Sequence, residues 1–425
     1  MTTTDTSRVR SQALRRLQAG DKVGVVAASL GVSTSTLYRW KREKHSTATK
    51  PTQARRPGAK RAAAIPAPVG GYLGDITGPG ITDGWGVTAT DLGVCAVAPN
   101  GKLVSVFGDT FSGDSVGQGD WRAPVALIGS GDAKTLIQYQ DAAGIDTSYA
   151  EQLWTYVHDS SPWNQGGIST VIPSDLLVIG KTMYLHAIVN RGFGNVIWTG
   201  IWSSTDNGVT WQEMGPQATF PASMDNGYAQ LWSWDYNPDD GWVYVVSTGF
   251  QRDKGIILRR VQPGDIGDGS KYSGWGWDGS QWAWDNTPTP ITPPAETWGE
   301  LTLRRLDSGT WILGGFLSSG YALGYRTIDS PTANLYEAAI QTPLVGSTWD
   351  AQDLANNQVA QLYGGYVLPG STLDTTGGVG LVVSQWDTAT GWPYRAMQFK
   401  VTLTDTTKTT ATAPRAAKGP RRRRV

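Results

Sequence analysis

The chain has 425 residues, including 53 Gly, 20 Trp and 16 Tyr, and its formal net charge at pH 7 is zero. This length exceeds the usual size of a single hydrophobic core, so we expect a large body built from repeated units. Residues 1–63 carry 14 basic and 3 acidic side chains, residues 64–399 carry 14 and 32, and residues 400–425 carry 8 and 1, so the acidic body excludes nucleic acid as its main ligand whereas both basic ends can contact phosphate.

The N-terminal segment, residues 8–44, contains three short helical patterns and is typical of a helix-turn-helix module, which we expect over residues 1–44. Gly31 permits the sharp turn, and Ser33 caps the third helix. The TLYRWKRE segment resembles the recognition helix of transposases and resolvase-type recombinases. The residues predicted to contact DNA are Thr34, Ser35, Thr36, Tyr38, Arg39, Lys41 and Arg42. A three-helix adaptor that docks another protein is the alternative.

Two basic segments of low complexity flank the acidic body. Residues 45–68 are rich in Ala, Pro, Lys and Arg, which predicts a flexible basic linker. Residues 403–425 predict a disordered basic tail. The large domain is therefore expected over residues 69–402.

A β-hairpin predicted between Gly80 and Phe111 carries the best indication of chemistry. Its turn, Pro99-Asn100-Gly101, suits a three-residue loop and places Ala98 opposite Lys102. Counting outward puts Asp91 opposite Asp109 on the same face, where desolvation and mutual repulsion would leave one carboxyl protonated and the other ionised. Such a pair is what glycosidic bond cleavage needs. Two ordinary strand-end aspartates that cap turns are the alternative, since a slip of one residue would separate them.

Strand-like runs recur after this hairpin, each ended by Gly, Asp or Asn turns, so the fold predicted is mainly β and repeated. The units divide best into five blades of a β-propeller, near residues 84–150, 168–215, 225–290, 296–345 and 358–402. Residues 204–211 fit the S-x-D-x-G-x-T-W Asp-box, in which Asp206 ties a hairpin turn together and has a structural role. The segment 264–284, rich in Gly and Trp, is expected to be a lid or a long surface loop.

Cysteine and histidine usage bears on cofactors and location. Cys95 is the only cysteine, so no intrachain disulfide forms. His45, His158 and His186 are scattered without the spacing of a zinc site, so we expect no cofactor and no metal, although an oxygen-coordinated calcium stays open. Without a long apolar run or a hydrophobic N-terminal segment, we expect neither a membrane partner nor a signal peptide.

Several motifs in order resemble a known family. They are TDLGV at 90–94, FGDTF at 107–111, IPSD at 172–175, YLH at 184–186, YVVSTGFQR at 244–252, WGELTLRR at 298–305, YGGYVLPGS at 363–371, SQW at 384–386 and PYRAMQF at 393–399. Over residues 70–402 the chain resembles the domain-of-unknown-function family 4185, grouped with the endo-D-arabinanases of glycoside hydrolase family 183. The resemblance implies a five-bladed propeller that cleaves α-linked D-arabinofuranosyl chains of the mycobacterial type of cell wall. It also implies two catalytic aspartates, at positions that match Asp91 and Asp109.

Eight further residues in or near these motifs are candidates for substrate binding: Asp175, His186, Gln251, Arg252, Glu300, Gln385, Trp386 and Tyr394. Structural roles are the alternatives for most of them. These are turn capping for Asp175, core packing for His186, bridging between blades for Gln251 and Arg252, and a salt bridge to Arg304 for Glu300.

Three functions follow as hypotheses. The first is an arabinan-cleaving hydrolase, phage-encoded, that acts on cell-wall arabinan or arabinogalactan from the phage tail or from the host cytoplasm before lysis. The second is a non-catalytic, glycan-binding minor tail protein that contacts other phage tail proteins. The third is a regulator that binds DNA through residues 1–63 and senses a sugar with its propeller.

Overall fold

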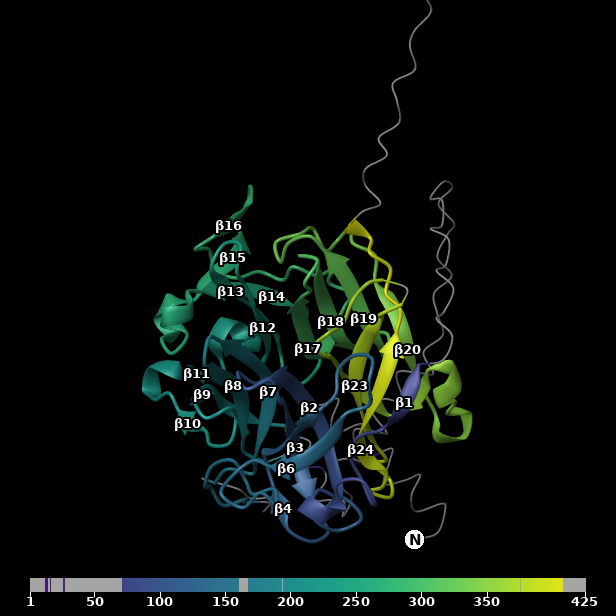
Figure 1. The fold of residues 1–425 in the computed structure, drawn as a ribbon. Helices are drawn as coiled ribbons and strands as arrows, with labels where there is room; N and C mark the ends of the chain where they lie inside the picture. Colours follow the sequence, from purple (N-terminus) through teal and green to yellow (C-terminus); the bar gives the residue numbers. More distant parts are fainter. Residues whose placement is uncertain are drawn as a thin grey trace, which may run out of the picture. The chain divides into compact units, whose positions relative to one another are not determined.

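The computed structural model describes residues 71–159, 167–192, 194–374 and 376–407, and the helical residues Gln12, Ala13, Arg16 and Val26 (Figure 1). The chain divides into two compact units, Met1–Ala64 and Ile65–Val425. The DNA-contacting residues predicted between Thr34 and Arg42, the linker at 45–68 and the tail beyond residue 407 lie outside the described residues.

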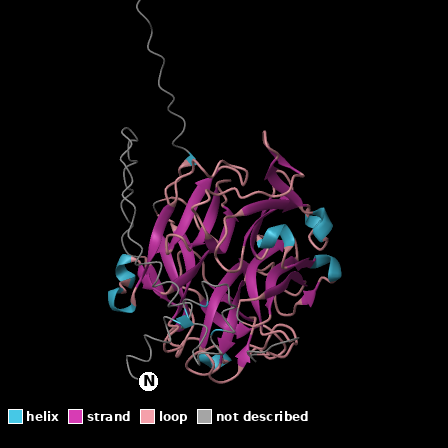
Figure 2. Cartoon of the chain, turned by 180° about the vertical axis from the view of Figure 1, so that it is seen from behind, coloured by secondary structure: helices cyan, strands magenta, loops and turns pink. Residues whose placement is uncertain are grey.

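The second unit is a β-propeller of five sheets, as predicted (Figures 1 and 2). The first blade consists of β2 (Ala89–Val97), β3 (Leu103–Phe111), β4 (Trp121–Arg122), β5 (Val125–Ser130) and β6 (Gln138–Ala142). The second consists of β7 (Thr170–Ile179), β8 (Thr182–Asn190), β9 (Val196–Ser204), β10 (Gln212–Glu213) and β11 (Thr219–Pro221). The third consists of β12 (Leu231–Asn237), β13 (Trp242–Thr248), β14 (Ile257–Val261), β15 (Ser273–Trp277) and β16 (Trp282–Trp284).

The last two blades complete the ring. The fourth consists of β17 (Trp298–Arg305), β18 (Trp311–Leu317), β19 (Ala322–Ile328), β20 (Gln341–Ser347) and β21 (Gln358–Ala360), with β21 parallel to β20. The fifth consists of β22 (Leu362–Val367), β23 (Val379–Trp386), β24 (Tyr394–Val401) and β1 (Tyr72–Asp75). Short 3-10 helices lie in the connections: η1 (Asp83–Trp85), η2 (Pro216–Ala218), η3 (Met224–Gly227), η4 (Pro263–Asp265), η5 (Gly269–Lys271), η6 (Trp349–Ala351) and η7 (Leu354–Asn356).

Two details of the blades differ from the sequence-based expectation. Strand β1 precedes the first predicted blade, yet it pairs with β24 and closes the ring, helped by an Arg395–Asp75 ion pair of 2.6 Å. Residues 264–284, predicted as a lid or a surface loop, instead form η4, η5 and the outer strands β15 and β16 of the third blade. Both elements complete sheets, which satisfies backbone groups of the outer strands.

The first strand of each blade, β2, β7, β12, β17 or β22, lies next to the axis, and each contacts its counterparts in the neighbouring blades. Contacts between these inner strands join residues at matching heights. Tyr363 near the start of β22 reaches Asp91 near the start of β2. Ser174 and Asp175 of β7 bond to Trp232 and Trp234 of β12 in the same order along both strands. The five inner strands therefore run in the same direction, and all of them begin at one end of the axis.

Large aromatic side chains fill the spaces between blades. Trp232, Trp234, Trp298 and Trp311 are at most 2% exposed. Such side chains remove large apolar areas from water, and this burial favours the folded state. Much of the unusual Trp content therefore belongs to the core.

The predicted hairpin forms with the predicted turn. Ala98 donates to the Lys102 carbonyl at 2.8 Å, Gly101 adopts a φ of +83°, and pairs such as Thr90↔Thr110 keep the expected register. Register shifts between Thr90 and Val94 place a bulge at Asp91. Because the two shifts compensate each other, the pairing on either side follows one register.

The Asp-box also forms. The Asp206 carboxylate accepts hydrogen bonds from Thr210 N (3.0 Å), Thr210 Oγ1 (2.6 Å) and Ser204 Oγ (2.7 Å). Neighbouring Asn207 accepts from the backbone of Asn100, in the turn at the far end of the β2–β3 hairpin. The box thus lies at the opposite end of the propeller from the start of the inner strands.

Candidate active site

Polar side chains from four inner strands meet where these strands begin. Asp91 is the third residue of β2, Thr170 opens β7, Glu300 is the third residue of β17 and Tyr363 is the second of β22. Asp109, near the end of β3, lies at the same end because β3 is antiparallel to β2. We call this end of the axis the mouth of the propeller.

Asp91 is a carboxyl group with incomplete hydrogen bonding. Its Oδ2 accepts a bond of 2.8 Å from the Tyr363 hydroxyl, whereas its buried Oδ1 has no partner among the described residues. Burial, and next the charge of Asp109, raise the pKa of Asp91 to about 7, although the Tyr363 and Tyr394 hydroxyls lower it. Asp91 therefore holds a proton for much of the time near neutral pH.

Asp109 has better support for its anion. Its Oδ1 accepts from the Thr170 hydroxyl at 2.5 Å and from Trp121 Nε1 at 2.8 Å. Burial raises the pKa of Asp109, but these two donors and the charge of His158 oppose that rise. His158 stacks on Trp121 with ring centroids 4.1 Å apart and is itself held by Gln152. The two aspartates thus share a site but differ in how well each stabilises a negative charge.

A third carboxylate, that of Glu300, is near enough to Asp91 for its charge to raise the pKa of Asp91. Glu300, which is 7% exposed, forms an ion pair with Arg252, and its Oε2 has no partner among the described residues. The Arg252 guanidinium also lies 5.1 Å from the centre of the Tyr363 ring. The alternative that paired Glu300 with Arg304 is wrong, because Arg304 binds Asp175 instead.

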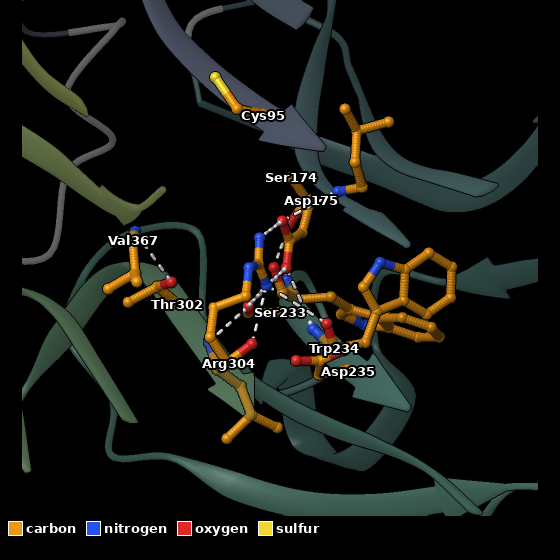
Figure 3. Close-up of polar contacts among 12 residues, drawn as sticks. Cys95, Ser174, Asp175, Ser233, Trp234, Asp235, Thr302, Arg304 and Val367 are labelled. Carbon is orange, nitrogen blue, oxygen red and sulfur yellow. Dashed lines mark hydrogen bonds and ion pairs between the residues drawn. The ribbon is translucent and has the colours of Figure 1, made fainter. Parts of the chain in front are cut away.

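Asp175 lies deeper along the axis and is fully buried (Figure 3). The Arg304 guanidinium donates hydrogen bonds of 2.5 and 2.8 Å to the two carboxylate oxygens. The Ser233 hydroxyl and the Trp234 backbone N–H donate two further hydrogen bonds. Burial by itself would lower the pKa of Arg304. The charge of Asp175 and its hydrogen bonds outweigh that effect, so the pKa of Arg304 is raised and the side chain is positively charged. These contacts join blades two, three and four and occupy both Asp175 oxygens.

The remaining predicted residues divide by position. Tyr394 is 4% exposed, and its hydroxyl lowers the pKa of Asp91 by hydrogen bonding. Gln251 is exposed and bonds to the Gly194 carbonyl of the second blade. Gln385 is fully buried and bonds to Ala360, Gln352 and Arg395. Trp386 is partly exposed, and its ring meets that of Tyr394 with centroids 5.5 Å apart.

His186 is fully buried beneath Trp232, and its two ring nitrogens have no partner among the described residues. Burial, together with the charge of Arg259, lowers the pKa of His186 well below its ordinary value, so the ring is neutral. The structure therefore brings Asp91, Asp109, Glu300, Arg252 and Tyr394 together at the mouth, whereas Asp175 and His186 lie further along their strands. Gln385 is at the mouth end of the fifth blade, opposite Leu362, but its side-chain amide is bonded to Ala360 and Gln352.

Sequence reasoning missed Tyr363, Thr170, Trp121 and His158, which all support the two aspartates. Tyr363 lies in the YGGYVLPGS motif and near the start of an inner strand, so its position was a usable signal. Trp121 and Thr170 reach Asp109 from other segments, and nothing in their local sequence indicates this.

Other features of the propeller lie outside the mouth. Within the described ranges, no group of three or more His, Cys, Asp or Glu side chains is placed to hold a metal ion. An open hollow of about 570 Å³ lies on the second blade, lined by residues such as Trp198, Glu213 and Pro216. No helix of the described part of the chain is long and apolar enough to cross a membrane.

The protein is thus a five-bladed β-propeller with interacting carboxyl groups at its mouth. Its fold is shared with a candidate hydrolase from Bacteroides ovatus, at a TM-score of 0.53 and 12% identity, over 79% of this chain and 90% of that one. The chain belongs to the family described as Domain of unknown function (DUF4185), whose profile matches residues 77–400. A homeodomain-like domain matches residues 4–46, in agreement with the predicted helix-turn-helix.

Two relatives are similar over most of their length. An uncharacterized 35.9 kDa protein encoded in the asd 3' region of Mycolicibacterium smegmatis is 29% identical, over 77% of this chain and 97% of that protein. Notoamide biosynthesis cluster protein J' of Aspergillus versicolor is also 29% identical, over 71% of this chain and 82% of that protein.

Proposed function

We propose that the propeller is an endo-acting glycoside hydrolase that cleaves α-linked D-arabinofuranosyl chains of the mycobacterial type of cell wall. The observation that carries this proposal is the pair of interacting carboxyl groups, Asp91 and Asp109, at the mouth. Two carboxyl groups with different affinities for a proton are the equipment of a glycoside hydrolase. The arabinan substrate rests on the motif resemblance to glycoside hydrolase family 183.

Within this proposal, Asp91 is the proton donor and Asp109 is the base or nucleophile. Asp109 accepts two hydrogen bonds on one oxygen, which stabilises its anion, whereas the buried Oδ1 of Asp91 accepts none. The neutral form of Asp91 then gives its proton to the oxygen of the leaving sugar. The Asp109 carboxylate acts at the anomeric carbon, directly or through a water molecule.

Substrate binding is proposed for the predicted residues that line the mouth. Glu300 offers its unpartnered Oε2 to a sugar hydroxyl, and Arg252 holds Glu300 in place. Trp386, which is partly exposed and packs on Tyr394, offers aromatic surface to a sugar ring, and the buried Tyr394 interacts with Asp91. Asp175, His186 and Gln385 are proposed to shape the site indirectly, because their polar groups are engaged or buried. The proposed context is a phage-encoded enzyme, with residues 1–44 as a DNA-binding module.

The test is the release of oligosaccharides from purified mycobacterial arabinogalactan by the wild type, Asp91→Asn and Asp109→Asn. We expect both variants to lose activity by about a thousandfold, while Asp141→Asn, an exposed carboxylate on β6, keeps it. An aryl arabinofuranoside with a good leaving group separates the roles, because it needs no proton donor. Asp91→Asn should regain much of its rate on that substrate, and Asp109→Asn should not.

Two outcomes would contradict the proposal. A folded wild type that releases nothing but stays bound to the polymer would be a glycan-binding protein. A wild type that neither cleaves nor binds arabinogalactan would remove the arabinan substrate altogether.

A further inference from the structure

The outer hairpin of the third blade carries four tryptophans on one face. Strand β15 pairs with β16 so that Trp275 lies opposite Trp284 and Trp277 opposite Trp282. Side chains alternate between the faces of a strand, so Gly276 and Ala283 take the other face. The result is an array of four indole rings, which we call the indole face.

One end of the indole face is fixed to the propeller, and the other is open. Trp275 and Trp284 pack against the core, and the Arg260 guanidinium lies 4.1 Å from both the Trp284 and the Trp242 ring centres. Trp277 is 47% exposed, and its ring centroid lies 6.0 Å from that of Trp282. Trp282 is partly exposed, because one part of its ring stacks on Trp275 and packs against the core. An exposed Trp beside a partly exposed one forms an apolar patch that is uncommon unless the surface contacts something.

The open rings are held rigidly. Asp278 closes the hairpin turn by accepting bonds from Ser280 N (2.8 Å) and Gln281 N (2.9 Å). The reverse face is covered by the segment at 286–289, since a Cβ on Gly276 would lie 2.0 Å from the Thr287 carbonyl oxygen. A rigid surface loses little conformational freedom when it binds a ligand.

The open rings lie at the same end of the propeller as the mouth. Neighbouring strands of the third blade are antiparallel, so the strand ends that lie at the mouth alternate. They are the start of β12, the end of β13, the start of β14, the end of β15 and the start of β16. Figures 1 and 2 show the β15–β16 hairpin at the outer edge of its blade. Three strand spacings separate β12 from β15 and four separate it from β16, so Trp277 and Trp282 lie roughly 15–20 Å from the inner strand.

The chemistry of the indole face favours a neutral polysaccharide chain. The π faces of indole rings are negative and attract the polarised C–H groups of sugar rings. Residues 273–289 include Asp278 and Asp285 and no basic residue, and the Arg260 guanidinium stacks against the Trp242 and Trp284 rings at the fixed end, so the open end disfavours a phosphate polymer. A Trp offers at most about 250 Å², so two open rings supply far less than the roughly 800 Å² per partner of a stable protein interface.

We propose that Trp277 and Trp282 form a second, non-catalytic site that holds a long polysaccharide chain whose other part lies in the mouth. The identity of this chain as arabinan rests on the proposed function, but its binding requires no hydrolysis. Because the two sites are roughly 15–20 Å apart, only a polymer of several sugars reaches both. Short oligosaccharides should be insensitive to the second site.

The experiment measures retention of the full-length chain by purified mycobacterial arabinogalactan in affinity electrophoresis, with Asp109→Asn present throughout to prevent cleavage. We expect Trp277→Ala with Trp282→Ala to weaken retention by at least about fivefold. Tyr replacements at both positions should preserve part of it, and Tyr336→Ala, which removes a 52% exposed aromatic side chain elsewhere, should preserve all of it. Thermal unfolding of each variant identifies any loss that comes from misfolding.

Cleavage by the chain with native Asp109 separates the two proposals. With the Ala pair, the rate on arabinogalactan should fall, and the rate on a short synthetic D-arabinofuranosyl oligosaccharide should not change. Undiminished retention by the folded Ala pair, or no retention of the parent, would overturn the second site. Retention that depends on Trp277 and Trp282 without any cleavage by the wild type would instead overturn the proposed hydrolase.

Discussion

Asp91 and Asp109 are the same residue type on adjacent strands, and their neighbours make them different. Thr170 and Trp121 donate to Asp109, whereas Asp91 has an unpartnered oxygen and is near the charges of Asp109 and Glu300. A pKa of about 7 means that folding binds a proton to Asp91 that the unfolded chain releases. Ionisation of Asp91 in the folded protein therefore lowers the free energy of unfolding.

This loss should appear as a dependence of stability on pH. The pKa of Asp91 rises from its ordinary 3.8 to about 7, so the wild-type free energy of unfolding falls as the pH rises between these values. Asn does not ionise, so Asp91→Asn should be more stable than the wild type by up to about 4 kcal/mol at pH 8 and nearly equally stable near pH 4. Urea unfolding at both pH values measures the difference.

Asp132→Asn is the control of opposite sign. Backbone and hydroxyl donors from Lys134 and Thr135 lower the pKa of Asp132 despite the opposing effect of burial. That variant should lose stability relative to the wild type equally at pH 8 and pH 5, and the loss should shrink only as the pH falls below the ordinary carboxyl pKa of 3.8. Equal behaviour of the two variants would show that Asp91 is an ordinary carboxylate.

At the scale of the element, the bulge in the β2–β3 hairpin shapes the site. Gly108 and Asp109 face the single residue Asp91, and Leu92 takes a φ of +64°. A Cβ on Gly108 would lie 2.4 Å from Asp91 Oδ1 and 3.1 Å from Leu92 Cδ1. The absence of a side chain at position 108 therefore leaves room for the Asp91 carboxyl group.

Gly108→Ala should displace that carboxyl while leaving the fold intact, because both close atoms belong to side chains that can move. We expect the rate of arabinan cleavage to fall about ten- to a hundredfold, since small displacements of a catalytic group are costly. Gly264→Ala, where a Cβ would meet nothing within 4 Å, is the matched control. Measuring kcat alongside thermal unfolding checks the result, and an unchanged rate in Gly108→Ala would show that the site tolerates the shift.

At the scale of the molecule, five blades are held together by contacts across the axis as well as by β1. The buried pair Asp175–Arg304 joins the second and fourth blades, and Ser233 connects the third. Every oxygen of Asp175 is engaged, so the pair positions the inner strands that carry the mouth. A buried ion pair of this kind is costly to break because one charge is left without a partner.

Asp175→Asn should therefore destabilise the propeller by about 3–5 kcal/mol. The exposed pair Lys102–Asp141, at 3.3 Å, is the matched control, and Asp141→Asn should cost less than about 1 kcal/mol. Denaturant unfolding monitored by tryptophan fluorescence measures both. Equal effects of the two substitutions would mean that the axial pair contributes no more than a surface pair.

Local chemistry made much of the fold predictable. The turn at residues 99–101 and the Asp-box around Asp206 depend on residues close in sequence, and both form as expected. The hairpin register also forms as predicted except at the bulge, where Asp91 faces Gly108 as well as Asp109 instead of pairing with Asp109 alone. The five blades follow from alternating strand patterns with regular turns. By contrast, β1 pairs with β24 from the other end of the domain, and no local pattern indicates that partner.

The amino-acid sequence by itself determined the repeated β architecture, the homeodomain-like N-terminal segment and the pair Asp91 and Asp109, because each depends on short-range spacing or on recognisable motifs. Only the tertiary structure decided what surrounds that pair. Tyr363 reaches Asp91 across 272 positions of sequence, and Arg304 binds Asp175 across 129. Such contacts exist only once the ring of blades has closed, which is why Glu300 finds Arg252 rather than its near neighbour Arg304.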